Sequence, residues 1–203
     1  MIGTPVRVEH PDGQDWSWGS WARVDTVGEV LGVPIKQTVY GVDIEGNELS
    51  ASEIQALVQA GIPRVLTGMG ISAAALSSGN QSSLVTGNSQ INVLLGGNVA
   101  PDWSGQFTMG NADGDQLQFS ANGVLDAASG ALATSANGYS LNAFGKNHQQ
   151  STLTKNEVNA RLVGSEGNAT GSIGDFGFEH KVSGPKVQGV FGSNLTPAGA
   201  GVN

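Results

Sequence analysis

Cysteine is absent from the 203 residues of this chain, and charged residues make up only 13% of it. The chain therefore has no disulfide, no thiolate metal ligand and no cysteine nucleophile. It also has no run of about 18 apolar residues, the length that a membrane-spanning helix needs. Its first residues lack the apolar core of a signal peptide, so we expect a mature region or a segment of a longer protein.

Positive charge is scarce as well. Nine lysine and arginine residues against seventeen aspartate and glutamate residues give a formal net charge of −8. An acidic surface repels phosphate groups, which argues against nucleic acid and anionic membranes as partners. The sequence contains no nucleophile elbow, phosphate loop or dinucleotide fingerprint, so we expect a protein that is not an enzyme.

Glycine is the residue that is present in excess, with 31 copies beside 38% hydrophobic residues. Glycine adopts the positive φ angles that tight turns require. The composition therefore predicts many short strands joined by turns, in a chain long enough to bury a core. One helix interrupts this pattern, because Ser50 and Glu53 have the spacing of a capping box. An apolar stripe at helical spacing follows it at Ile54, Leu57 and Val58.

Alternating apolar residues predict strands through most of the remaining chain. Two dipeptides, Asn122-Gly123 and Asn137-Gly138, predict hairpin turns, because both central residues of a type I′ turn need positive φ. Gly174 interrupts the alternation of its segment, which predicts a bulge or a bend.

The fold class that these patterns favour is mainly β, an antiparallel up-and-down β-barrel of about eight strands with one short helix inserted near residues 50–60. Closing a meander into a barrel removes unpaired strand edges. A two-sheet sandwich is the alternative. We expect a flexible arm over residues 1–15, one barrel domain over 16–195 with the helical insertion at 50–61, and a flexible tail over 196–203.

Three tryptophans within six positions, Trp16, Trp18 and Trp21, are the first candidate site. Trp16 and Trp18 share one face if this segment is a strand. Tryptophan exposes a large apolar ring whose N–H needs a partner when it is buried. The cluster is therefore either packing inside a small barrel or an aromatic contact surface for a ligand.

Residues that could bind haem or a metal ion are further candidate sites. Of the three histidines, His148 is the best candidate for a haem ligand, because it lies in the polar stretch 145–150 after a predicted strand. His148 can equally be a solvated loop residue. The alternation of Asn111, Asp113 and Asp115 is similar to a calcium loop, but it lacks the twelve-residue spacing and the final glutamate, and a plain hairpin turn has the same composition.

Three short motifs are similar to those of a known protein family. They are Trp18-Gly19-Ser20-Trp21, the stretch Ser172–Phe178 with its Asp-Phe-Gly, and the terminal Val187–Gly192. Together they resemble the β-barrel domain of transferrin-binding protein B-like surface lipoproteins and their secreted relatives, including haemophores. The resemblance is strongest in roughly the last fifty residues. This chain departs from the family in lacking a lipidation cysteine and a further Gly-Gly-x-Phe strand.

The resemblance implies a non-enzymatic binding module, extracellular or on the bacterial cell surface, whose barrel loops bind haem or a host iron-carrier protein. The alternative is a structural module of a surface fibre, adhesin or envelope assembly that associates with copies of itself. Calcium is the only other bound group that the residues suggest, at Asn111, Asp113 and Asp115.

Overall fold

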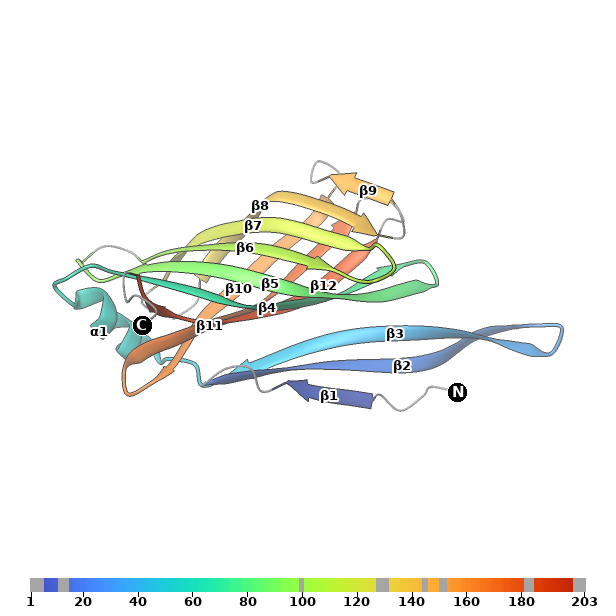
Figure 1. Ribbon diagram of the computed structural model, residues 1–203, viewed down its shortest axis with the longest axis horizontal. Coiled ribbons are helices and arrows are strands. Elements are labelled where there is room, and N and C mark those ends of the chain that lie inside the picture. The colour runs from blue at the N-terminus through green and yellow to red at the C-terminus, as the bar shows by residue number, and fades with distance from the viewer. Residues whose placement is uncertain are drawn as a thin grey trace.

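The protein consists of a closed β-barrel, a smaller three-stranded sheet against its outer wall, and one helix at one end (Figure 1). This computed structural model describes residues 6–10, 15–98, 101–126, 132–143, 146–149, 153–180 and 185–198. The predicted fold class is confirmed: the chain is mainly β, with a curled antiparallel sheet and one short helix.

The barrel wall is an antiparallel meander in which each strand pairs with the next along the chain. Its strands are β4 (Arg64–Ser78), β5 (Gln81–Leu95), β6 (Asp102–Gly110), β7 (Gln116–Leu125), β8 (Leu132–Ala143), β10 (Leu153–Ser165), β11 (Asn168–His180) and β12 (Lys186–Asn194). β12 returns to pair with β4, and three residue pairs between β8 and β10 close the ring. Two short strands are added at its rims, β9 (Lys146–Gln149) beside β8 and β13 (Thr196–Pro197) beside β4.

The tight turns of the structure lie elsewhere than at the two Asn-Gly dipeptides, so both predicted hairpins are wrong. β7 runs straight through Asn122-Gly123, which pair with Ser104 and Trp103. Asn137-Gly138 lies within β8, where the register with β7 shifts around Phe119 and forms a bulge. A turn at either place would cut a strand that the ring needs at full length.

Two other dipeptides adopt the type I′ geometry instead. Leu31-Gly32 has φ angles of 51° and 80°, and Glu166-Gly167 has 53° and 71°. Each pair joins two strands of at least 13 residues, β2 to β3 and β10 to β11. The long ladders on both sides hold the non-glycine residue at a φ that it would otherwise avoid.

The predicted bulge at Gly174 is also wrong, because the β11 register is continuous from Gly171 to Glu179 against β12. The alternation changes because β11 is buried on both faces. Ile173 faces outward beneath the small sheet, whereas Phe176 and Phe178 face the lumen. A β-carbon at Gly174 would overlap the ring of Phe191, so glycine there makes room for an aromatic side chain.

Aromatic side chains fill the lumen of the barrel. They are Trp103, Phe107, Phe119, Phe176, Phe178 and Phe191, all buried. The ring of Phe107 lies 4.3 Å from that of Phe119 and 4.8 Å from that of Phe191, centroid to centroid. The Trp103 indole N–H donates across the lumen to the Ser172 hydroxyl over 3.1 Å. Where the structure describes its side chains, the barrel is therefore a packed core, and the buried Trp103 indole N–H has a partner.

The small sheet contains β1 (Val6–His10), β2 (Trp16–Val30) and β3 (Val33–Gly46), in that order. Trp16 and Trp18 point from β2 to the outer wall of the barrel, where they pack with Ile173 and Val190. A β-carbon at Gly192 would overlap the Trp16 ring, and the Trp16 indole N–H donates to the Asn194 side-chain oxygen over 2.9 Å. Trp16 thus anchors this sheet on β12.

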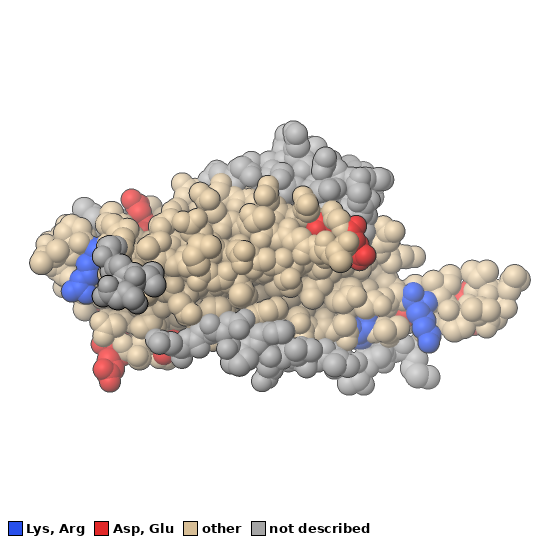
Figure 2. Space-filling view, in the orientation of Figure 1, with Lys and Arg blue, Asp and Glu red and all other residues tan. Residues whose placement is uncertain are grey.

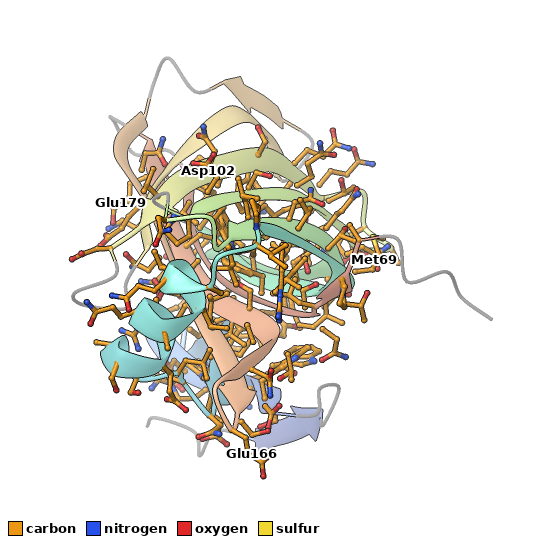
Figure 3. All side chains as sticks on the ribbon, turned by 90° about the vertical axis from the view of Figure 1, so that its left-hand side faces the viewer. Met69, Asp102, Glu166 and Glu179 are labelled. Atoms are coloured by element: carbon orange, nitrogen blue, oxygen red, sulfur yellow. The ribbon has the colours of Figure 1, made fainter. Side chains whose placement is uncertain are left out.

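The helix α1 (Ala51–Gln59) begins and is capped as the sequence predicts. Ser50 is its N-cap, and both hydrogen bonds of the capping box are present between Ser50 and Glu53. Ile54 is fully buried in the barrel core, and Leu57 and Val58 pack against it. Figure 3 looks onto this end of the barrel, where α1 lies across part of the opening above the β10–β11 turn marked by Glu166.

The capping box makes the start of α1 sensitive to acid. Hydrogen bonds from the Ser50 side chain, the Ser50 backbone and the Gly167 N–H hold the pKa of Glu53 below its usual value. A lowered pKa in the folded state means that this contribution to stability is complete above the unfolded value of about 4.3, and is lost as pH falls through the folded value.

We therefore expect the Glu53 carboxyl to titrate below a solvent-exposed glutamate, measured by carbon-detected NMR between pH 2 and 7. In Ser50→Ala the Glu53 midpoint should rise towards the ordinary value. An unchanged midpoint in Ser50→Ala would contradict the capping box as the cause.

Candidate interaction surface

The ends of β2 and β3 extend past the barrel as a two-stranded arm (Figure 1). Every residue from Thr26 to Lys36 is exposed, and we call this segment the projecting hairpin. β1 pairs with β2 only as far as Ala22, so β1 does not reach the projecting hairpin. A two-stranded hairpin without further support is marginally stable in water.

The projecting hairpin carries half of the exposed large hydrophobic residues that the structure describes. They are Val27, Val30, Leu31, Val33 and Ile35, and Leu31 at the turn is 98% exposed. Val30 pairs with Val33, and Ile35 pairs with Gly28, so the side chains of Val30, Val33 and Ile35 share one face. Figure 2 shows the arm as mostly uncharged, with basic residues where it leaves the body.

Local sequence explains why this segment stays a hairpin. The β-branched residues favour extended backbone, and Leu31-Gly32 forms the type I′ turn. An extra residue at Val27 shifts the register between Thr26 and Gly28, and such a bulge increases strand twist. An apolar, twisted arm with open edges is a surface that a partner can cover.

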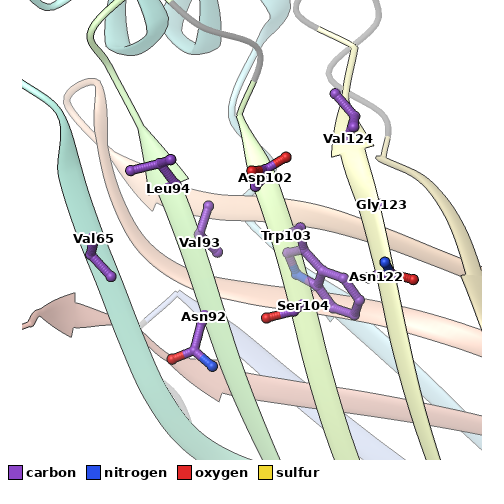
Figure 4. Close-up of a pocket in the computed structure, with 10 residues that line it drawn as sticks. All are labelled: Val65, Asn92, Val93, Leu94, Asp102, Trp103, Ser104, Asn122, Gly123 and Val124. Carbon is purple, nitrogen blue, oxygen red and sulfur yellow. The ribbon is translucent and has the colours of Figure 1, made fainter. Parts of the chain in front are cut away.

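A second surface, lined by both polar and apolar residues, lies on the outer wall of the barrel, on the ends of β4 to β7 (Figure 4). It is an open hollow of about 440 Å³. Val65 and Val124 are exposed on its sides, and the Asp102 side chain lies at its edge. Met69 is exposed further along β4.

The three tryptophans of the sequence prediction do not form one surface. Trp16 is 5% exposed and Trp18 is 7% exposed, between the small sheet and the barrel. Trp21 lies on the opposite face of β2, over Gly41 of β3, and is half-buried. The first two are therefore packing residues on the outside of the barrel, and the tryptophan inside it is Trp103.

The loop with Asn111, Asp113 and Asp115 is the β6–β7 turn, and its polar groups bond to one another. The Asn111 side-chain oxygen accepts from the backbone N–H groups of Asp113 and Asp115, at 3.1 and 3.0 Å. The Asp115 carboxylate accepts from the Asn111 amide and from the Ser83 hydroxyl. This is the geometry of an Asx turn, and calcium binding there stays a prediction.

His148 lies on β9 and pairs with Leu141 at the rim of the barrel. His10 is on β1 and His180 is at the end of β11. The side chains of all three histidines lie outside what the structure describes. In the described part of the chain, no three His, Asp or Glu side chains gather as a metal site would require. The single described helix is too short to cross a bilayer.

The fold and its surfaces define a solid-core, eight-stranded barrel with a docked hairpin sheet. No protein-family model matches the chain, and no curated protein matches its sequence. A solved structure with a similar fold is intact Ap-TbpB (N and C lobes), a transferrin-binding protein B, at a TM-score of 0.52 and 11% identity. The similarity covers 96% of this chain and 38% of that one.

At 11% identity this similarity shows a distant likeness of fold. It agrees with the resemblance to the transferrin-binding protein B barrel that the three sequence motifs suggest. The chain spans less than two fifths of the length of that protein, so the likeness does not extend to the whole molecule.

Proposed function

We propose that this chain is a non-enzymatic binding module, on the bacterial surface or secreted, that captures a protein partner with the projecting hairpin. The observation that carries this proposal is the uninterrupted exposure of Thr26 to Lys36 with five large apolar side chains. Leaving such residues in water is costly, and exposed apolar patches mark interaction sites. The first partner class to test is a host iron-carrier protein, since the structural neighbour is named for binding transferrin.

A protein partner fits this surface better than haem. The lumen is packed with aromatic rings, and the projecting hairpin is a long, thin arm rather than a pocket. A partner strand can pair with the open edge of β2 beyond Ala22, while Leu31 and Val33 bury against its surface. Backbone pairing then supplies orientation, and the apolar tip supplies most of the affinity.

The test is a binding measurement with immobilised transferrin, iron-loaded and iron-free, against the full chain. We expect the double substitution Leu31→Asp and Val33→Asp to weaken binding at least 30-fold, about 2 kcal/mol, because both are at the centre of the covered surface. The matched control is Val65→Asp with Met69→Asp, which adds the same charge on the barrel wall and should change affinity less than threefold. Equal loss in both double variants would contradict the hairpin as the binding surface.

Haem is the competing ligand, and the same preparation tests it. Addition of haemin to the full chain, followed by a Soret spectrum with and without His148→Ala, measures coordination by that residue. A Soret shift that His148→Ala removes, together with no transferrin binding, would replace the proposal by haem capture. Absence of binding to either form of transferrin would reject the iron-carrier class.

A second candidate is assembly of copies into a fibre or envelope structure. The observation that favours it is the presence of exposed apolar side chains on two unlike surfaces, the projecting hairpin and the hollow beside Val65 and Val124. Contact between unlike surfaces of identical chains propagates without closing. Light scattering after size exclusion should then show a mass that rises with concentration and returns to one chain in the Leu31→Asp, Val33→Asp variant.

A further inference from the structure

A third surface, between α1 and the end of the barrel, has the properties of a small-molecule site. It is a hollow of about 450 Å³, a size common for ligand pockets. Its floor consists of Leu66, Leu95 and Leu195, all buried, and its side is formed by the end of α1 and its C-cap, Ala60. Figure 3 shows this end of the barrel, with α1 in front of the opening.

Among the described residues that line this hollow, Arg64 at the start of β4 is the only one with a formal charge. Its guanidinium forms no ion pair or side-chain hydrogen bond within the described residues. Two of the nearby uncharged polar side chains already have partners: the Thr170 hydroxyl donates to the Asp15 carboxylate, and the Asn168 amide donates to the Glu166 carbonyl. Arg64 is therefore the one cationic donor available to a bound molecule.

An apolar hollow with a single cation at its rim is complementary to a molecule with an apolar body and one negative end. We propose that the hollow beneath α1 binds a free medium-chain carboxylate, with its alkyl chain on Leu66, Leu95 and Leu195 and its carboxylate on Arg64. This site is independent of the projecting hairpin, so its test does not depend on the proposed function.

The alkyl chain and the head group make separable predictions. In calorimetric titrations of the full chain with octanoate, nonanoate and decanoate, Kd should fall about fourfold per added CH₂, which is about 0.8 kcal/mol. Arg64→Gln should weaken the binding of decanoate at least fivefold and leave the binding of decanol unchanged. The control Lys186→Gln, which removes a cation elsewhere, should leave decanoate binding as it is.

Filling the hollow tests its position. Ala56 is exposed on α1 and lines the hollow, so Ala56→Trp should fold normally and abolish binding of both decanoate and decanol. Gln55→Trp places the same ring on a neighbouring exposed position outside the lining and should bind decanoate like the parent chain. Absence of saturable decanoate binding, unchanged affinity in Ala56→Trp, or equal losses for decanoate and decanol in Arg64→Gln would each overturn the proposal.

Discussion

Replacement of Trp16 by alanine is expected to lower the free energy of unfolding by about 3–5 kcal/mol, the range for removing a buried tryptophan. The indole fills the space between β2 and β12, where Gly192 leaves room for it, and its N–H bonds to Asn194. Loss of the ring leaves a cavity between the two sheets and removes the hydrogen bond from the indole N–H to Asn194. Urea unfolding followed by circular dichroism measures the change.

The packing of the Trp16 ring against β12 can also be tested by a substitution at Gly192. Gly192→Ala places a methyl group against the Trp16 ring. This overpacking should lower the free energy of unfolding by about 1–3 kcal/mol. In the double variant with Trp16→Ala that methyl group has space, so the double loss should be smaller than the sum of the two single losses. Additive losses would contradict direct contact between these residues.

Trp21→Ala is the matched control, because Trp21 is on the same strand but on the face away from the barrel. Its half-buried ring lies over Gly41 of the small sheet, so we expect the free energy of unfolding to fall by about 1 kcal/mol. A loss as large as that of Trp16→Ala would mean that the small sheet is held by something other than the Trp16 contact.

Replacement of Phe107 by alanine is expected to lower the free energy of unfolding by a similar amount, about 3–5 kcal/mol. Phe107 stacks on Phe119 at 4.3 Å and also packs on Phe191 and Trp103, so its removal opens a cavity at the centre of the lumen. The cavity should be dry and apolar, and benzene should recover part of the lost stability. Thermal unfolding with and without benzene measures both effects.

The control for the lumen is Met69→Ala on the outside of β4, where the side chain is exposed and should change stability by less than about 0.5 kcal/mol. Failure of Phe107→Ala to destabilise the chain would show that the lumen is not packed. That result would also reopen the barrel interior as a ligand site, and it would weaken the case for a protein partner over haem.

Two local features follow from short sequence patterns. The capping box at Ser50 and Glu53 produces the start of α1, because two orphan N–H groups are satisfied by side chains only three residues apart. The alternation of Tyr40, Val42 and Ile44 produces a strand with Val42 and Ile44 packed on the barrel. The up-and-down meander was predictable too, because short turns between successive strands leave few other pairings.

The same kind of local reasoning failed at the Asn-Gly dipeptides and at Gly174. Asn122-Gly123 has the right residues for a turn, but the pairing of β7 with both β6 and β8 holds it extended. The broken alternation at Gly174 indicates a bulge if only one face of the strand is buried. In the structure both faces of β11 are buried, one towards the lumen and the other beneath the small sheet. Both errors arise where contacts with other strands outweigh a local preference.

The candidate surfaces depend even more on distant contacts. Val30-Leu31-Gly32-Val33 is a visible apolar run, yet only the docking of Trp16 and Trp18 at the other end of β2 leaves it projecting. The hollow at Arg64 is lined by α1, β4, β5, the β10–β11 turn and the segment after β12, which no spacing in the sequence brings together.

The antiparallel strands and the capped helix follow from the sequence, because alternation and capping involve residues only a few positions apart. The tertiary structure alone decided that the barrel is filled, that two of the tryptophans lie outside it, and that an apolar arm is left without cover. Those outcomes depend on which faces become buried when strands more than a hundred residues apart pair and pack, and burial of that kind leaves no local pattern.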